Sequence, residues 1–489
     1  MNLKSLSWIA LLAISSVSFG QTDKELTDKT VSKEEAFAHL SFLASDELKG
    51  RDTPSEGQEI AAKYLATQLA LYGVKAFPTL PDFRQRVPFK KIIAPSSGVI
   101  AAGGESFSYN TDFLKMTGEN IQWSGEVVKL KHATAEEIAG VDVKGKMIVG
   151  SCGDGTDPSP QTWFSQSSDK RKAAKAAGAI GLIELYNSPQ IPWQLLVRYL
   201  SGDRVTLDKG ETALTSFWLL DDNKKASIAF ENAKSMEINV DGPASGKFTA
   251  PNVVGFVEGT DPKLKNEYVV YTAHFDHVGI GQPDAQGDSI YNGARDNAVG
   301  AVAVLQAAKN LAKYPTKRSA LFVFFTGEEK GLLGSEWFVD NSPLEINKMV
   351  YCNNVDGAGY NDVTKVTVIG LERTTAMDNI VAACKTYGLE AIKDPAPEQG
   401  LFERSDNVQF AKKGVPAPDF SLGLTAFDAE IQKYYHQAGD HAENMDLAYL
   451  HKYWSAYVLT GRMVANAKEK PFWVEGDKYY NAGVELYKK

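Results

Sequence analysis

Acidic residues and histidines recur at a few points in the second half of this 489-residue chain. His274 and Asp276 are separated by one residue, so the Asp276 carboxylate can accept the second ring N–H of His274 and fix its tautomer for metal binding. Asp296 follows within the segment 292–297, and His436 lies much later, within 434–440. Each position taken alone has an ordinary explanation, such as a helix cap at Asp296 or a surface histidine.

Glu328 and Glu329 are adjacent acids at the end of an apolar run, and Asp356 follows another such run. Burying one charge costs several kcal/mol unless it is paired or bound to a metal. Neighbours in an extended segment point to opposite sides, so one acid can bind a metal while the other faces an attacking water. Four carboxylates in one cleft, these three and Asp296, would repel one another without cations. Mixed nitrogen and carboxylate donors favour zinc, and two ions about 3.5–4 Å apart can hold a hydroxide for hydrolysis.

The elements that position these residues are apolar runs at 268–272, 320–325 and 349–352. Runs of this kind are typical of strands buried on both faces of a largely parallel sheet. An Ala-rich amphipathic segment at 298–311 predicts a helix between the first two strands. In such sheets, ligands bind beyond the carboxyl ends of the strands, which is where the acids and histidines follow.

Helices are predicted near the start of the chain by two capping boxes, Ser32 with Glu35 and Ser55 with Gln58. Gly73 can close the second helix in the left-handed conformation. Residues 77–120 predict short strands and loops. The following block predicts strands at 127–130, 147–149 and 179–183 and a helix at 170–177.

The ordered set of site segments resembles the zinc peptidases that include aminopeptidase S, aminopeptidase Y and glutamate carboxypeptidase, and residues 119–249 resemble the β-rich protease-associated domain found in exported peptidases. The resemblance implies two Zn²⁺ per chain and a cis peptide bond between Asp296 and Asn297. It also implies one role for each site residue: Asp296 bridges both ions, His274 and Asp356 complete one site, Glu329 and His436 complete the other, Glu328 is the general base, Asp276 supports His274, and Tyr435 stabilises the oxyanion. Arg404 is predicted to contact the substrate.

We therefore predict an α/β fold with a mostly parallel mixed sheet flanked by helices, of the zinc-peptidase phosphorylase/hydrolase-like class. The predicted organisation is a signal peptide at 1–20, a catalytic domain formed by 21–118 and 250–489, and the β-rich insert at 119–249.

The composition and the first residues indicate which partners and which compartment to expect. The net charge of −9 is spread along the chain, which argues against a nucleic-acid partner. Residues 1–20 have the basic start, short apolar run and small-residue cleavage site of a secretory signal, so we expect export to the periplasm or the extracellular space, without membrane insertion. Among three cysteines, a bridge between Cys352 and Cys384 and free buried thiols are both open.

The favoured activity is removal of N-terminal residues from peptides by a zinc-bound hydroxide. A glutaminyl cyclase would use a single zinc. A carboxypeptidase would need cationic side chains for the substrate carboxylate, for which Arg404 alone is thin support. A receptor-like binding protein would have lost the ligands, and here all are present. His277, His441 and His451 are predicted to be surface or core residues, because nothing in the sequence pairs them with the ligands.

Overall fold

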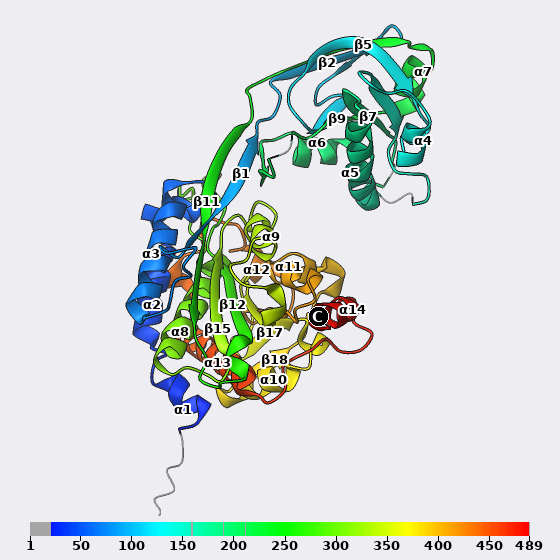
Figure 1. Ribbon diagram of the computed structural model, residues 1–489. Coiled ribbons are helices and arrows are strands. Elements are labelled where there is room, and N and C mark those ends of the chain that lie inside the picture. Colours follow the sequence, from blue (N-terminus) through cyan, green and yellow to red (C-terminus); the bar gives the residue numbers. More distant parts are fainter. Residues whose placement is uncertain (1–20, 158–159, 189, 211, 489) are drawn as a thin grey trace, which may run out of the picture. The chain divides into compact units, whose positions relative to one another are not determined.

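The computed structural model describes residues 21–157, 160–188, 190–210 and 212–488 (Figure 1). The predicted signal peptide lies outside these residues. The chain forms two compact units, one made of the residues up to Gln85 and from Asn252 onward, the other of Arg86–Pro251. The predicted insert boundary at 119 falls inside the second unit, because the strand at Ser97–Ala102 pairs with the strand at Ser235–Asp241 in that unit's sheet.

The first unit is built on a mixed sheet in the order β18-β17-β19-β16-β12-β15-β11. At its centre, β12 (Tyr268–His274) is parallel to both β15 (Ser319–Phe325) and β16 (Met349–Val355). The other strands are β11 (Gly246–Val257), β17 (Lys365–Ile369), β18 (Glu390–Ile392) and β19 (Asp419–Ser421). Only the pairs β11–β15 and β17–β19 are antiparallel among these neighbours, which confirms the predicted mostly parallel mixed sheet.

Helices cover both faces of this sheet. Val269 and Tyr271 of β12 are buried against one set of helices, and Val270, which points to the opposite face, is buried against another. The first face carries α2 (Lys33–Leu43), α3 (Glu56–Tyr72), α8 (Val299–Lys313), α10 (Met377–Thr386) and α13 (Leu447–Asn466); the second carries α9 (Leu333–Asp340), α11 (Asn407–Lys412) and α14 (Tyr480–Tyr487). The predicted helix at 298–311 corresponds to α8. Two short helices, α1 (Asp23–Asp28) and α12 (Ala429–Gln432), complete the unit.

The predicted helix starts are confirmed. The Ser32 and Ser55 hydroxyls accept hydrogen bonds from the backbone N–H groups of Glu35 and Gln58, at 3.3 and 3.1 Å. Gly73 ends α3 with a φ of 83°, the left-handed conformation that favours glycine.

The second unit has its own sheet, in the order β3-β2-β10-β5-β6-β7-β9-β4, and its own buried cores. Its strands are β2 (Ser97–Ala102), β3 (Glu105–Ser108), β4 (Phe113–Thr117), β5 (Gln122–Lys129), β6 (Met147–Ser151), β7 (Gly181–Tyr186), β9 (Thr215–Leu220) and β10 (Ser235–Asp241), and its helices are α4 (Ala135–Ala139), α5 (Pro160–Ala176), α6 (Trp193–Leu200) and α7 (Lys225–Asn232). β8 (Arg204–Leu207) pairs with β1 (Arg84–Ile92), which begins in the first unit. The assignment of the second unit as a protease-associated domain stays a prediction.

Cys152, Cys352 and Cys384 are all free and buried, in line with the second of the two cysteine alternatives. Across the described residues, the structure contains no helix with the length and apolar character needed to cross a membrane.

Candidate metal centre

Four of the predicted site residues lie at the carboxyl edge of the central strands. His274 is the last residue of β12, and Asp356 directly follows β16. Glu328 and Glu329 follow β15 after two residues. Parallel strands bring their carboxyl ends to one edge, which is why residues up to 82 positions apart meet here.

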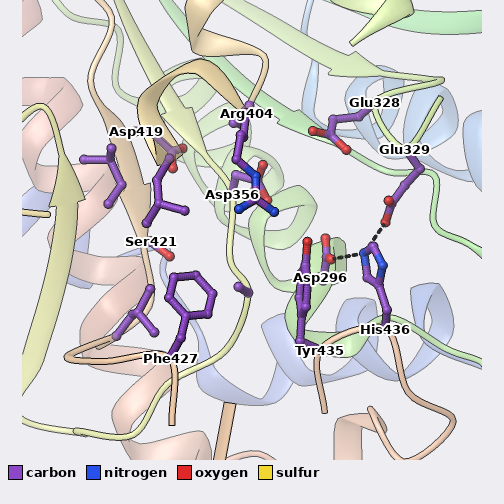
Figure 2. Close-up of a pocket in the computed structure, with 15 residues that line it drawn as sticks. Asp296, Glu328, Glu329, Asp356, Arg404, Asp419, Ser421, Phe427, Tyr435 and His436 are labelled. Carbon is purple, nitrogen blue, oxygen red and sulfur yellow. Dashed lines mark hydrogen bonds and ion pairs between the residues drawn. The ribbon is translucent and has the colours of Figure 1, made fainter. Parts of the chain in front are cut away.

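Asp296 and His436 reach the same place from loops. Asp296 lies in an irregular turn, Ala294–Ala298, immediately before α8, and its peptide bond to Asn297 is cis, which confirms that expectation. His436 follows α12 and has a φ of 52°. Figure 2 shows its ring directed toward the carboxylates of Asp296 and Glu329.

The first donor group contains His274, Asp356 and one oxygen of Asp296. His274 Nε2 lies 3.2 Å from Asp356 Oδ1 and 3.3 Å from Asp296 Oδ1. Donors bound tetrahedrally to one zinc at about 2.0–2.1 Å are about 3.3–3.4 Å from one another. The spacing of this group therefore fits a single zinc ion.

The second donor group contains the other oxygen of Asp296 together with Glu329 and His436. His436 Nε2 lies 3.1 Å from Asp296 Oδ2 and 3.2 Å from Glu329 Oε1. His277, which the sequence analysis left outside the site, is fully buried beside them, with Nδ1 2.8 Å from Glu329 Oε1. Asp296 directs Oδ1 to the first group and Oδ2 to the second, as a carboxylate that bridges two ions would.

Asp276 supports His274 through its main chain. His274 Nδ1 is 3.2 Å from the Asp276 carbonyl oxygen, whereas the Asp276 carboxylate is 3.8 Å away. That carboxylate accepts hydrogen bonds from the Thr53 hydroxyl and from the backbone N–H of Glu328, both at 3.2 Å. Asp276 thus links the exit of β12 to the loop that carries Glu328.

Glu328 lies beside the first group, with a carboxylate oxygen within 4.8 Å of the ligand atoms of His274 and Asp356. Burial raises the pKa of its carboxyl well above the usual range, and the neighbouring acids Asp356, Asp406 and Glu329 raise it further. A carboxyl with a raised pKa takes up a proton more readily than an ordinary glutamate, which suits it to general acid–base transfer.

In the absence of cations, the imidazoles carry protons. Burial opposes the charged form of His436, but its contacts with Asp296 and Glu329 raise its pKa to about 10. Asp356 and Glu328 likewise raise the pKa of His274 well above the usual range, against the effect of burial. The carboxylates therefore require positive charge at both groups, and divalent ions supply it.

The donor groups open into a pocket that encloses about 590 Å³, counted out to its mouth. Figure 2 shows Arg404 and Tyr435 beside the donors, with Asp419, Ser421 and Phe427 further along the pocket. Apolar side chains of Ile369, Leu401 and Leu424 also line it. The predicted residues Arg404 and Tyr435 are therefore within the same cavity as the donors.

Two arginines hold the loops around the site. Arg51, fully buried, donates hydrogen bonds to the carbonyl oxygens of Phe275 and Asn292, both at 2.7 Å. Arg295 Nη1 donates to Asp440 Oδ1 at 2.9 Å, and the same carboxylate accepts the backbone N–H of Arg295 at 2.9 Å. This pair ties the turn at Asp296 to the loop that follows His436.

Sequence reasoning missed Asp406 and Asp419 as well as His277. Asp419 begins β19 and its Oδ1 accepts a hydrogen bond from Asn354 Nδ2 at 2.8 Å. Burial raises the pKa of both acids, that of Asp406 to about 7. The signal available in the sequence was weak, because β19 has only three residues and Asp406 stands among ordinary loop residues.

A mixed α/β sheet with histidine and carboxylate donors at the carboxyl edge of its parallel strands defines a metal-binding protein of the α/β class. Residues 252–459 match the model of peptidase family M28. All the donors described above lie within the matched segment.

Curated relatives match part of the chain. Aminopeptidase YwaD of Bacillus subtilis (strain 168) is 27% identical over 312 residues, which cover 62% of this chain and 59% of that protein. Leucine aminopeptidase 2 of Trichophyton equinum is 26% identical over 302 residues, 58% of this chain and 56% of that protein. The match thus spans less than two thirds of these relatives.

The fold is shared over a longer stretch with the solved structure of the aminopeptidase from Aneurinibacillus sp. strain AM-1. The TM-score is 0.55 at 20% sequence identity, and the match covers 91% of this chain and 96% of that one. This similarity supports the α/β architecture of the first unit.

Proposed function

We propose that this protein is an exported aminopeptidase that uses two zinc ions to remove N-terminal residues from peptides. The observation that carries the proposal is the pair of donor groups that share the Asp296 carboxylate beside Glu328. Mixed imidazole and carboxylate donors favour zinc, which supplies an activated water and polarises the peptide carbonyl. The curated relatives are named aminopeptidases, and the predicted signal at 1–20 supports export.

Glu328 takes the proton from the attacking water, which its raised pKa favours, and delivers it to the leaving amine. Burial raises the pKa of the Tyr435 hydroxyl, so it stays protonated and can donate a hydrogen bond to the carbonyl oxygen as negative charge develops there. Arg404, in the same pocket, is placed to contact the substrate.

The charges of the pocket favour an amino terminus over a carboxyl terminus. Among the residues that line it, Arg404 is the one lysine or arginine, whereas Glu328 and Asp419 are acids outside the proposed donor set. The carboxyl oxygens of these two acids can accept hydrogen bonds from a substrate ammonium, whereas a terminal carboxylate would find a single cationic side chain. This distribution supports an aminopeptidase rather than a carboxypeptidase.

The test is to incubate the purified protein with short peptides whose termini are free or blocked, with and without a chelator, and to identify the products. Release of residues from free amino termini only, lost on chelation and restored by zinc, is expected. Release of residues from free carboxyl termini would contradict the aminopeptidase proposal and indicate a carboxypeptidase. One bound zinc with cyclisation of N-terminal glutamine would indicate a glutaminyl cyclase, and zinc binding without turnover would indicate a binding protein.

A further inference from the structure

We propose that His277 is a metal ligand, through Nδ1, and that it completes the second donor group to four protein donors. The inference rests on the proposed two-metal site and adds to it a third imidazole. It makes the two ions unequal, because the first group has three protein donors and the second has four.

Four of the six distances between the donor atoms of the second group can be compared with those around one zinc ion. His277 Nδ1 lies 2.8 Å from Glu329 Oε1 and 4.0 Å from Asp296 Oδ2. With the 3.1 and 3.2 Å separations from His436, the four values scatter around the roughly 3.3 Å spacing of donors around one zinc. All four donor atoms lie within 4.8 Å of one another.

Hydrogen bonds within the described residues do not account for the buried ring of His277. Its side chain is fully buried, and neither ring nitrogen has a hydrogen-bond partner in the described part of the chain. Glu329 Oε1 also lacks one, so the 2.8 Å contact is close but not aligned as a hydrogen bond. Burying a polar atom without a hydrogen-bond partner is unfavourable, and a metal ion between the two atoms would offset that cost.

The ring is held in this position by its surroundings. Gly293 has a φ of 58°, and a Cβ there would lie 2.6 Å from ring atoms of His277, so only glycine leaves room for the imidazole. The rings of His277 and His436 meet edge to face, with centroids 5.3 Å apart. The His277 backbone N–H donates to the carbonyl oxygen of the buried Arg51.

Four protein donors close a tetrahedral zinc site, whereas three leave a position open for water or substrate. In a tetrahedral arrangement, an ion in the second group would therefore have no position left for water. Substrate approaches at the first group, where His274, Asp356 and Asp296 leave one position and where Glu328 lies. The two ions are expected to differ in how tightly they are held.

X-ray absorption on the zinc-loaded, full-length protein counts the imidazoles directly. We expect three imidazoles shared by two ions, and the His277→Gln variant should show two. Titration with a zinc-buffering chelator should show one ion of the variant weakened at least about ten-fold, with the other unchanged. His441→Gln is the matched control, because His441 is a neighbouring histidine outside both donor groups, and it should behave as wild type.

The outcomes separate the two proposals. A wild-type protein that binds no zinc overturns the proposed function. Two zinc ions with two imidazoles in the wild type, or a His277→Gln variant that holds both ions as tightly as wild type, overturns the role of His277 and leaves the function standing. If the variant does not fold, the imidazole count of the wild-type protein decides.

Discussion

Glu328 and Glu329 are adjacent in the chain, but the carboxylate of Glu329 lies in the second donor group and that of Glu328 lies beside the first. Glu328→Gln keeps the shape of the side chain and removes the base. We expect turnover to fall by about 10²–10⁴, the usual contribution of general acid–base catalysis, with zinc content close to that of wild type. Turnover measured beside zinc stoichiometry checks this, and normal turnover in the variant would rule out the mechanism.

Glu329→Gln changes a proposed metal ligand instead. This variant is expected to lose zinc together with activity, and added zinc should restore part of the activity. If both acids were surface residues, either change would alter the free energy of unfolding by less than about 0.5 kcal/mol and leave activity intact.

Asp406 is predicted to make stability depend on pH. Burial raises its pKa in the metal-free protein to about 7. A raised pKa favours the neutral acid in the folded protein. The folded state is therefore not penalised by Asp406 below the unfolded pKa of about 4, and the free energy of unfolding falls as pH rises from there to about 7. In zinc-free protein, the free energy of unfolding of Asp406→Asn should rise relative to that of wild type across this interval, by on the order of 1–3 kcal/mol.

Chemical denaturation at several pH values with a chelator measures this difference. The exposed acid Glu443, changed to Gln, is the control and should give no trend with pH. A difference in free energy of unfolding between Asp406→Asn and wild type that is constant from pH 4 to pH 8 would contradict the attribution of the pH dependence to Asp406.

The sequence allowed the site to be predicted where a donor directly follows a long apolar strand, as His274, Glu329 and Asp356 do. His277 was missed because its role depends on which way the chain turns after β12, and the sequence next to His274 carries no sign of that turn. Asp419 was missed for a different reason: its neighbours in space, Asn354 and Asp356, lie on another strand.

At the scale of elements, the loop after β15 depends on close packing at the start of α9. A Cβ on Gly334 would lie 2.0 Å from the Thr326 carbonyl oxygen and 2.6 Å from Asn252 Oδ1. Gly334→Ala should therefore displace this loop, lower the free energy of unfolding by about 1–3 kcal/mol and weaken zinc binding at Glu329.

Denaturant unfolding and zinc titration check both effects. Gly246→Ala serves as the control, because a Cβ at Gly246 meets nothing within 4 Å. Unchanged stability in Gly334→Ala would show that α9 can shift without disturbing the site.

The predicted elements were those with a strong local pattern. β12, β15 and β16 are buried on both faces and read as apolar runs, and α3 is marked at its ends by Ser55 and Gly73. The strands β17, β18 and β19, toward one edge of the sheet, have three to five residues and were not predicted. Pairing with strands distant in the sequence stabilises them, and segments this short carry too little hydrophobic periodicity to be recognised as strands.

At the scale of the whole molecule, both donor groups lie in the first unit, and the second unit has separate buried cores. Calorimetry should resolve two thermal transitions. Zinc at 100 times its dissociation constant stabilises the unit that binds it by about 2.7 kcal/mol. Chelation should therefore lower one transition by several degrees and leave the other unchanged.

Separate expression of residues 86–251 provides the control, because this fragment should melt at the temperature of the insensitive transition. A single transition that moves as a whole on chelation would mean that the two units unfold together.

The segment between His277 and Asp296 forms a small hairpin, in which β13 (Gly279–Ile280) pairs with β14 (Ile290–Tyr291) and residues 282–287 are exposed. Because the paired strands fix the distance between its ends, the tip can change in length without moving either donor. Each doubling of a flexible loop adds only about 0.6 kcal/mol of closure entropy. The tip therefore offers a place to attach a fluorescent label close to the metals in sequence, where it can report on their arrival without taking part in binding them.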